Sequence, residues 1–520
     1  MKNTLLLASL LLVLAACQKQ KEFAAEYQPN QNPAQPFTVA QLDAQIKTAI
    51  LTRGQFNWNE ASAHTVWSAL QQSDQIMSVG FKPAHIEADI SATIHQINIA
   101  QGSWAAARAQ LMQQILQQER TLNPSLVMAD IEAYQENTLP VVNVRVQAIS
   151  TVEMLRKNPL VRYAEPMGYE PRSDLFGANT QIVQASSSGC GSNTATAGLT
   201  EPADFVTIAP GSKQSWNHGY HGITAAWARS TGAGRRIMII DTGLSPDQAL
   251  FGTAFNSGSS SGRTLERRVT LRKAGFLGFG YSDVETSTAD ACGHGTAMAG
   301  AATAPRSPNG GAVGVAYNAS LMSVRASTDV LIDESREAKG VADAFVLAGN
   351  TPSVNIVSMS MGRLTSNSQI TDGINYAYNQ GKLIFCAAGT SFGWTAGWYG
   401  VIFPAWLSKV NAVTGIKDDL KSRCNACHDG SEVDFTVVME KTSNGRTPLS
   451  TAQSGFAPST VGGSSVATAT TAGIAALIWA KNPSWSRDQV LQKMILSSSN
   501  YPSKSSSLGW GRVNADLATQ

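Results

Sequence analysis

The second half of the 520-residue chain constrains the fold most, because short apolar segments alternate there with amphipathic ones. Apolar runs such as "RRIMIIDTG" are typical of strands that are covered on both faces. Alternating strands and helices predict a parallel sheet with helices on both sides, an α/β fold. In such sheets the reactive groups lie at the carboxyl-terminal ends of the parallel strands. The predicted strands are 235–243, 319–326, 354–362, 382–389 and 410–416, and the helices between them include 333–349 and 370–381.

The patterns in the first half of the chain predict several smaller segments and domains. Helical spacing dominates one region, whereas "VVNVRVQAIS" alternates apolar and polar residues as a half-buried strand does. A short helix and the strand "VRYAEP" follow it and complete a β-α-β unit. The expected organisation is a signal at 1–17, a flexible tether at 18–40, a helical region of no assignable family at 41–135, a β-α-β unit at 136–171, a linker at 172–215 with a site for proteolytic maturation, and a large α/β domain at 216–520.

The N-terminus indicates export. Lys2 precedes an apolar stretch, 5–13, that is too short to span a bilayer as a helix. Small residues before Cys17, in "LAAC", resemble the bacterial lipoprotein signal, which implies cleavage before Cys17 and its acylation. The alternative is an ordinary cleaved signal with an incidental cysteine. No later segment approaches the length of an apolar span, so we expect a lipid-anchored protein of the cell envelope, at the outer membrane in a diderm host.

The charge of the chain limits the classes of binding partner, and its cysteine content limits the possible disulfides. The net charge is +2 and only 15% of residues are charged, which argues against nucleic acid as the main partner. The envelope permits disulfides, and five cysteines follow Cys17, so at least one is free or pairs outside the chain. The sequence does not fix the pairing: Cys292 and Cys386 could bridge each other, either could pair with Cys190, or they could be buried structural thiols.

Three separated residues suggest nucleophilic catalysis. Asp241 ends a predicted buried strand, His294 stands between two glycines, and Ser465 precedes an apolar helix. A serine hydroxyl needs a base to take its proton, a neutral imidazole serves near pH 7, and a buried carboxylate orients the imidazole. A helix N-terminus at Ser465 would direct backbone N–H groups toward a developing oxyanion. The glycines flanking His294 are expected to leave room for substrate.

Taken in order, these motifs resemble those of the subtilisin-like serine proteases, the subtilases. The resemblance covers roughly residues 216–516 and includes "MIIDTG", "GHGTAMAG", "GVAYNASLMSVRA", "VSMSMG", "FPAWLSKVNAVTG" and "GGSSVATATTAG". It implies that Asp241 orients the imidazole, that His294 is the general base, and that Ser465, not Ser464, is the nucleophile. Similarly, "MLRKNPLVRYAEP" resembles the end of a subtilase propeptide, although an unrelated α+β module is the alternative.

The resemblance also implies a substrate cleft. An extended peptide would add antiparallel to the strand 358–362, and small residues would form the other wall of a roomy apolar pocket. The implied binding residues are Ser360, Met361, Gly362, Ala387, Ala388 and Gly389. Subtilisin-like folds often hold calcium, but the sequence assigns no metal ligand.

Two features depart from the family pattern. Thr390 stands where an asparagine usually donates to the oxyanion, so either Thr390 reaches the oxyanion, Ser391 substitutes for it, or the enzyme is slow. The motif "CNACH", Cys424 to His428, matches covalent haem attachment, but its place inside the protease-like region favours a Cys424–Cys427 disulfide or two thiols. Ala469 replaces a proline that the hydroxyl chemistry does not need.

The sequence therefore predicts a monomeric, envelope-anchored serine endopeptidase of the subtilisin type, made as a precursor and acting on proteins or peptides. The alternative is a subtilase-fold lipoprotein of weak or no activity that acts as a binding module.

Overall fold

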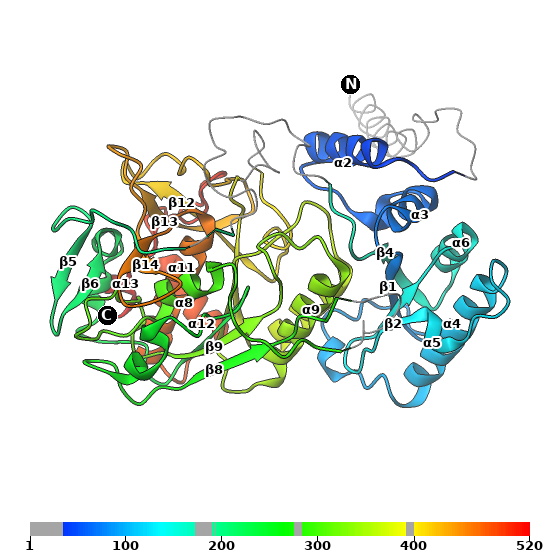
Figure 1. The fold of residues 1–520 in the computed structure, drawn as a ribbon, viewed down its shortest axis with the longest axis horizontal. Coiled ribbons are helices and arrows are strands. Elements are labelled where there is room, and N and C mark those ends of the chain that lie inside the picture. Colours follow the sequence, from blue (N-terminus) through cyan, green and yellow to red (C-terminus); the bar gives the residue numbers. More distant parts are fainter. Residues whose placement is uncertain (1–34, 172–189, 192, 275–282, 392–399) are drawn as a thin grey trace, which may run out of the picture.

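The computed structural model describes residues 35–171, 190–191, 193–274, 283–391 and 400–520. The expected signal with Cys17, most of the tether and residues 172–189 of the linker lie outside this part of the chain. The rest forms a catalytic body around a seven-stranded sheet and an N-terminal body around a four-stranded sheet (Figure 1).

The catalytic body contains the predicted parallel sheet. Its strand order is β13-β12-β11-β10-β7-β9-β8, and every neighbouring pair is parallel. The five predicted strands appear as β7, β9, β10, β11 and β12, so the α/β class is confirmed. The strands are β7 (Arg236–Asp241), β8 (Leu265–Val269), β9 (Ser320–Arg325), β10 (Ile356–Met359), β11 (Leu383–Ala387), β12 (Asn411–Lys417) and β13 (Val433–Glu440).

Helices cover both faces of this sheet. Ile237 and Ile239 of β7 face one core layer, and Met238 and Ile240 face the other, because successive side chains of a strand alternate. One layer holds α8 (His294–Thr303) and α11 (Gly463–Lys481), and the other holds α9 (Ser335–Asn350) and α10 (Ser368–Asn379). The smaller helices are α7 (Ile223–Ala226), α12 (Arg487–Leu496) and α13 (Ala515–Ala518), and the 3-10 turns of this body are η3 (Trp216–His221), η4 (Ala249–Phe251) and η5 (Thr253–Asn256).

One expectation about apolar segments was wrong. Helix α11 is long and apolar enough to cross a membrane by length and composition. In the structure 94% of its apolar window is buried, because it is the central helix of the catalytic body and packs on α8 and the sheet.

The N-terminal body is larger than the predicted β-α-β unit. Its antiparallel sheet has the order β2-β3-β1-β4, so β1 lies between the two predicted strands. The region expected to be only helical therefore contributes two strands of its own. The elements are α2 (Val39–Arg53), η1 (Trp58–Glu60), α3 (Ala63–Gln71), β1 (Ile76–Phe81), η2 (Ile94–Gln96), α4 (Gly102–Glu119), α5 (Met128–Ile131), β2 (Glu132–Tyr134), β3 (Val141–Arg145), α6 (Ile149–Lys157) and β4 (Val161–Pro166).

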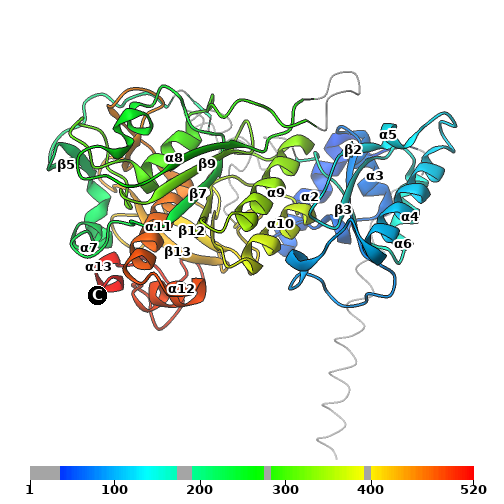
Figure 2. The ribbon, with the colours of Figure 1, turned by 90° about the horizontal axis from the view of Figure 1, so that it is seen from below.

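The two bodies meet where this four-stranded sheet covers α9 and α10 (Figure 2). The contact is buried and contains both apolar side chains and matched polar pairs. Gln369 of α10 accepts hydrogen bonds from Ser78 (3.0 Å) and Asn143 (2.6 Å), and Lys339 of α9 forms a 3.0 Å ion pair with Glu136. Unpaired buried charges are costly, so these matched partners fix how the sheet lies on the two helices.

Part of the predicted linker belongs to the catalytic body. Strands β5 (Phe205–Ile208) and β6 (Ser212–Ser215) form a hairpin, and Lys213 donates its backbone N–H to Gly311 at 2.8 Å. A second hairpin, β14 (Leu449–Thr451) with β15 (Pro458–Thr460), lies near α8.

Candidate active site

Asp241 and His294 meet where β7 ends and α8 begins. The imidazole Nδ1 lies 2.8 Å from Asp241 Oδ1, which also accepts the Thr242 backbone N–H at 2.8 Å. His294 is 7% exposed and Asp241 1% exposed. The carboxylate thus holds the ring in the orientation that leaves Nε2 for proton transfer.

The glycines beside His294 have local packing roles. Gly293 caps α8 with a φ of 85°, a left-handed conformation that glycine adopts without strain. A Cβ on Gly295 would lie 2.4 Å from the Gly243 carbonyl oxygen. Gly295 therefore lets the helix start lie against the turn after Asp241, and the expected room for substrate beside the imidazole stays a prediction.

Asp290 is a supporting residue that the sequence analysis missed. Its two carboxylate oxygens accept the Gly293 N–H (2.7 Å), the Thr296 N–H (2.8 Å) and the Thr242 hydroxyl (2.8 Å). It thereby joins the turn after β7 to the turn before α8. An acidic residue four positions before the histidine, in "DACGH", was the available signal.

The charges around His294 favour its protonated form. Burial alone would lower the pKa of this imidazole, but the negative charge and hydrogen bond of Asp241, with Asp290 and Asp329 farther away, raise the pKa above its usual value. Such an arrangement stabilises the imidazolium that forms when the ring accepts a proton.

Ser465 lies in the first turn of α11. Its backbone carbonyl accepts the Ser360 hydroxyl at 3.0 Å, which fixes the helix start against the strand that continues β10. Backbone N–H groups in a first turn have no partner within the helix. Among the described residues no hydrogen bond joins Ser465 directly to His294, and catalytic hydrogen bonds of unliganded sites often tighten only around substrate.

Ser465 opens onto a small cleft that contains most of the predicted binding residues. Ala388 is the exception: its backbone N–H and carbonyl are bonded to Val413 and Ile402 inside the sheet. Val330 and Ile402 are lining residues that the sequence analysis did not name. The cleft is lined by Val330, Ser360, Met361, Gly362, Ala387, Gly389, Thr390, Ile402, Ser464 and Ser465.

Thr390 stands beside the nucleophile position. Its Oγ1 accepts the Ser464 backbone N–H at 3.1 Å and lies 2.9 Å from the Ser464 hydroxyl. Ser391, the other candidate, lies 3.1 Å from the Nε2 of buried His428. Of the two hydroxyls, only that of Thr390 belongs to a residue of the cleft.

Comparisons with known proteins identify the family of the chain. Residues 232–511, more than half of the chain, match the model of the subtilase family, Peptidase_S8. The chain belongs to the subtilase family. It is 28% identical over 330 residues to an alkaline protease of Alkalihalobacillus alcalophilus, a match that covers 62% of this chain and 73% of the relative. It is 29% identical over 296 residues to subtilisin BL of Lederbergia lenta, covering 56% and 92%.

Among solved structures, this subtilase is similar to MycP1 from Mycobacterium smegmatis, with a TM-score of 0.46 and 20% identity over 65% of this chain and 94% of the other. The sequence resemblance to the subtilases is thus confirmed, and the family supports a serine endopeptidase that acts on proteins.

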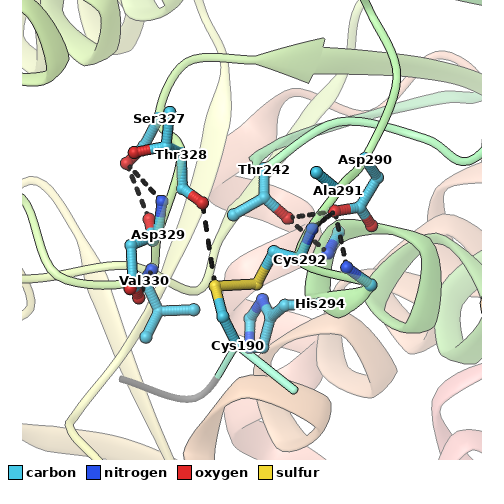
Figure 3. The surroundings of a disulfide bond; sticks show 12 residues. Cys190, Thr242, Asp290, Ala291, Cys292, His294, Ser327, Thr328, Asp329 and Val330 are labelled. Carbon is cyan, nitrogen blue, oxygen red and sulfur yellow. Dashed lines mark hydrogen bonds between the residues drawn. A yellow bond between two sulfur atoms is a disulfide. The ribbon is translucent and has the colours of Figure 1, made fainter. Parts of the chain in front are cut away.

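The part of this subtilase that the structure describes contains two disulfides. Cys190 pairs with Cys292, two residues before His294, so one of the open pairings is realised (Figure 3). Cys386 is a free, buried cysteine of β11, and burial raises the pKa of its thiol. It takes no part in either bridge.

The "CNACH" segment does not fit a haem. Cys424 and Cys427 form a disulfide, which removes both attachment thiols. His428 Nδ1 lies 2.8 Å from the Gly400 carbonyl and Nε2 3.1 Å from the Ser391 hydroxyl, so both ring nitrogens are engaged. Burial lowers the pKa of His428 to about 4. The segment instead supports the cleft wall, because the His428 backbone N–H donates to Gly389 at 3.0 Å.

Calcium finds little support in the described ranges. They contain no group of three or more acidic, histidine or cysteine side chains placed to hold a metal ion. Carboxylates usually supply several of the oxygen ligands of Ca²⁺. No step of the chemistry below is routed through a metal.

Proposed function

We propose that this subtilase is a serine endopeptidase that hydrolyses peptide bonds of proteins through an acyl-enzyme formed on Ser465. The observation that carries the proposal is the buried 2.8 Å contact between Asp241 and His294, with Ser465 at the start of a helix in the adjoining cleft. These residue types in these positions suit acyl transfer.

The proposed sequence of steps follows from the positions of the groups. His294 Nε2 takes the Ser465 proton as Oγ attacks the carbonyl carbon, and Asp241 stabilises the resulting imidazolium. The oxyanion accepts hydrogen bonds from the Ser465 backbone N–H and from the Thr390 hydroxyl. His294 then protonates the leaving amine, and water repeats the attack to release the acid.

We further propose that the chain is made as a precursor and held at the cell envelope by a lipid on Cys17, at the outer membrane in a diderm host, as a monomer. The N-terminal body covers α9 and α10 and resembles a subtilase propeptide at its C-terminal end, which suits removal by cleavage in the linker. The lipid anchor rests on the "LAAC" motif alone.

A comparison of serine variants tests the proposed activity. Purified full-length protein with Ser465→Ala should neither cleave its own linker nor hydrolyse a protein substrate, while Ser454→Ala, which changes an exposed serine, should behave as the parent. Equal hydrolysis by the parent and Ser465→Ala would contradict the proposal. An inactive parent would favour the alternative, a subtilase-fold binding module.

A further inference from the structure

The edge of the strand that a substrate would use is partly occupied. Alternate residues of a strand bond toward the same side, so Ser360 and Gly362 share one edge. Gly362 donates its N–H to the Val330 carbonyl at 3.0 Å and accepts the Ile332 N–H at 3.1 Å. Arg363, on the opposite edge, pairs with Phe403 instead.

The antiparallel register of a bound peptide shows which of its residues loses a backbone pairing. A peptide that adds antiparallel beside 360–362 would pair its first residue before the scissile bond with Ser360, because Ser360 adjoins Ser465. Its third residue before that bond would pair with Gly362. Both backbone groups of Gly362 are already bonded, so only the Ser360 pairing remains.

The loop 327–331 that occupies this edge is held in place. Glu337 of α9, 1% exposed, accepts the backbone N–H and the hydroxyl of Thr328 at 2.9 and 2.6 Å. Within the loop, the Ser327 hydroxyl donates to the Asp329 carbonyl at 2.6 Å. Swinging the loop aside would leave the buried Glu337 carboxylate without these donors, which is costly.

The Cys190–Cys292 disulfide lies against the same loop. Cys190 Sγ lies 3.7 Å from the Thr328 carbonyl oxygen, and Figure 3 shows the disulfide between that loop and the His294 ring. Asn193 secures the segment by donating to the Gly293 carbonyl at 3.1 Å. The disulfide and Asn193 thus add to the contacts that hold the loop in place.

We propose that this closed edge limits recognition to the first two residues before the scissile bond. The inference rests on the proposed function and deepens it, because it names a substrate class: peptides recognised through a short segment on the amino side of the cut. Residues farther upstream add no backbone pairing, so no backbone hydrogen bond of theirs can contribute to transition-state stabilisation.

A series of chromogenic peptides tests this limit with the full-length protein after self-processing. Acylated nitroanilides carry one to four residues of one apolar sequence, and two further tetrapeptides carry a single N-methyl group on the first or the third residue before the scissile bond. We expect kcat/KM to change less than twofold from two to four residues. N-methylation of the third residue should have no effect, whereas N-methylation of the first should lower kcat/KM at least fivefold.

Two outcomes would contradict the inference while leaving the proposed function intact: a tenfold rise in kcat/KM from two to four residues, or equal sensitivity to both methyl groups. Absence of hydrolysis of every peptide would refute the proposed function and the inference with it.

A pair of variants tests the role of the loop. Glu337→Ala should make the N-methyl group on the third residue lower kcat/KM, because the released loop exposes Gly362. Glu334→Ala, at the N-cap of the same helix, should not. If Glu337→Ala does not fold, the peptide series with the parent enzyme alone tests the inference. A folded Glu337→Ala enzyme whose kcat/KM is as insensitive to the N-methyl group on the third residue as that of the parent would contradict the loop's role.

Discussion

The hydroxyl of Thr390 is predicted to supply transition-state stabilisation that valine cannot. Thr390→Val keeps the β-branched shape and removes only the oxygen, which lies 3.1 Å from the Ser464 N and 2.9 Å from the Ser464 Oγ. If that oxygen merely positioned Ser464, its loss would cost about 1 kcal/mol, or roughly fivefold in rate. Loss of an oxyanion donor costs about 10²–10³ in kcat, a range taken from subtilisin itself.

Steady-state kinetics with one small peptide nitroanilide separates these two cases. We expect kcat to fall at least about 100-fold in Thr390→Val with little change in KM, the pattern of an interaction made only in the transition state. Thr468→Val is the matched control, because the Thr468 hydroxyl donates to the Ser464 carbonyl at 2.8 Å and the residue does not line the cleft. A Thr390→Val enzyme within tenfold of the parent, like the control, would show that the Thr390 hydroxyl does not stabilise the oxyanion.

Three further predictions concern pH and the second disulfide. Because the raised pKa of His294 keeps the base protonated to higher pH, kcat/KM should fall on acidification with an apparent pKa above about 6.5, and a pH–rate profile with a lower pKa would contradict this. Burial raises the pKa of Glu165 from 4.5 to about 7, although hydrogen bonds from Ser368 at the start of α10 partly offset this. The folded state therefore binds the proton of Glu165 more tightly than the unfolded state does. Roughly 3 kcal/mol of stability should be lost as pH rises from about 4.5 to 7; urea unfolding of the Ser465→Ala precursor should show this, and Glu165→Gln should flatten it. Replacing Cys424 and Cys427 by serine should lower the free energy of unfolding by about 2 kcal/mol, the value for so short a loop, and an unchanged value would mean that the bridge does not constrain the unfolded chain.

The sheet of the catalytic body was predictable where its strands are apolar throughout. Strand β7 is buried along nearly its whole length and shows this in sequence. Strand β8, at the edge, carries Glu266, Arg267 and Arg268 and has no apolar run, so no pattern marked it. Strand β1 escaped notice because it lies between helices in sequence and pairs with strands more than 60 residues later.

The sequence predicted the site residues that stand at the ends of helices and strands, but it did not predict the contacts between distant segments. Asp241, His294 and Ser465 each stand where a strand or helix begins or ends, and short motifs encode such positions locally. The bridge between Leu331 and Gly362 depends on how two distant segments pack, which the sequence pattern does not carry.

The central claim is that Ser465 is a nucleophile activated by His294, and covalent labelling measures this most directly. Purified full-length protein is treated with a fluorophosphonate probe, and the modified residue is located by peptide mass spectrometry. We expect one stoichiometric adduct on Ser465, lost in His294→Ala and retained in Ser454→Ala. Labelling that spares Ser465, or that persists undiminished without the imidazole, would contradict it.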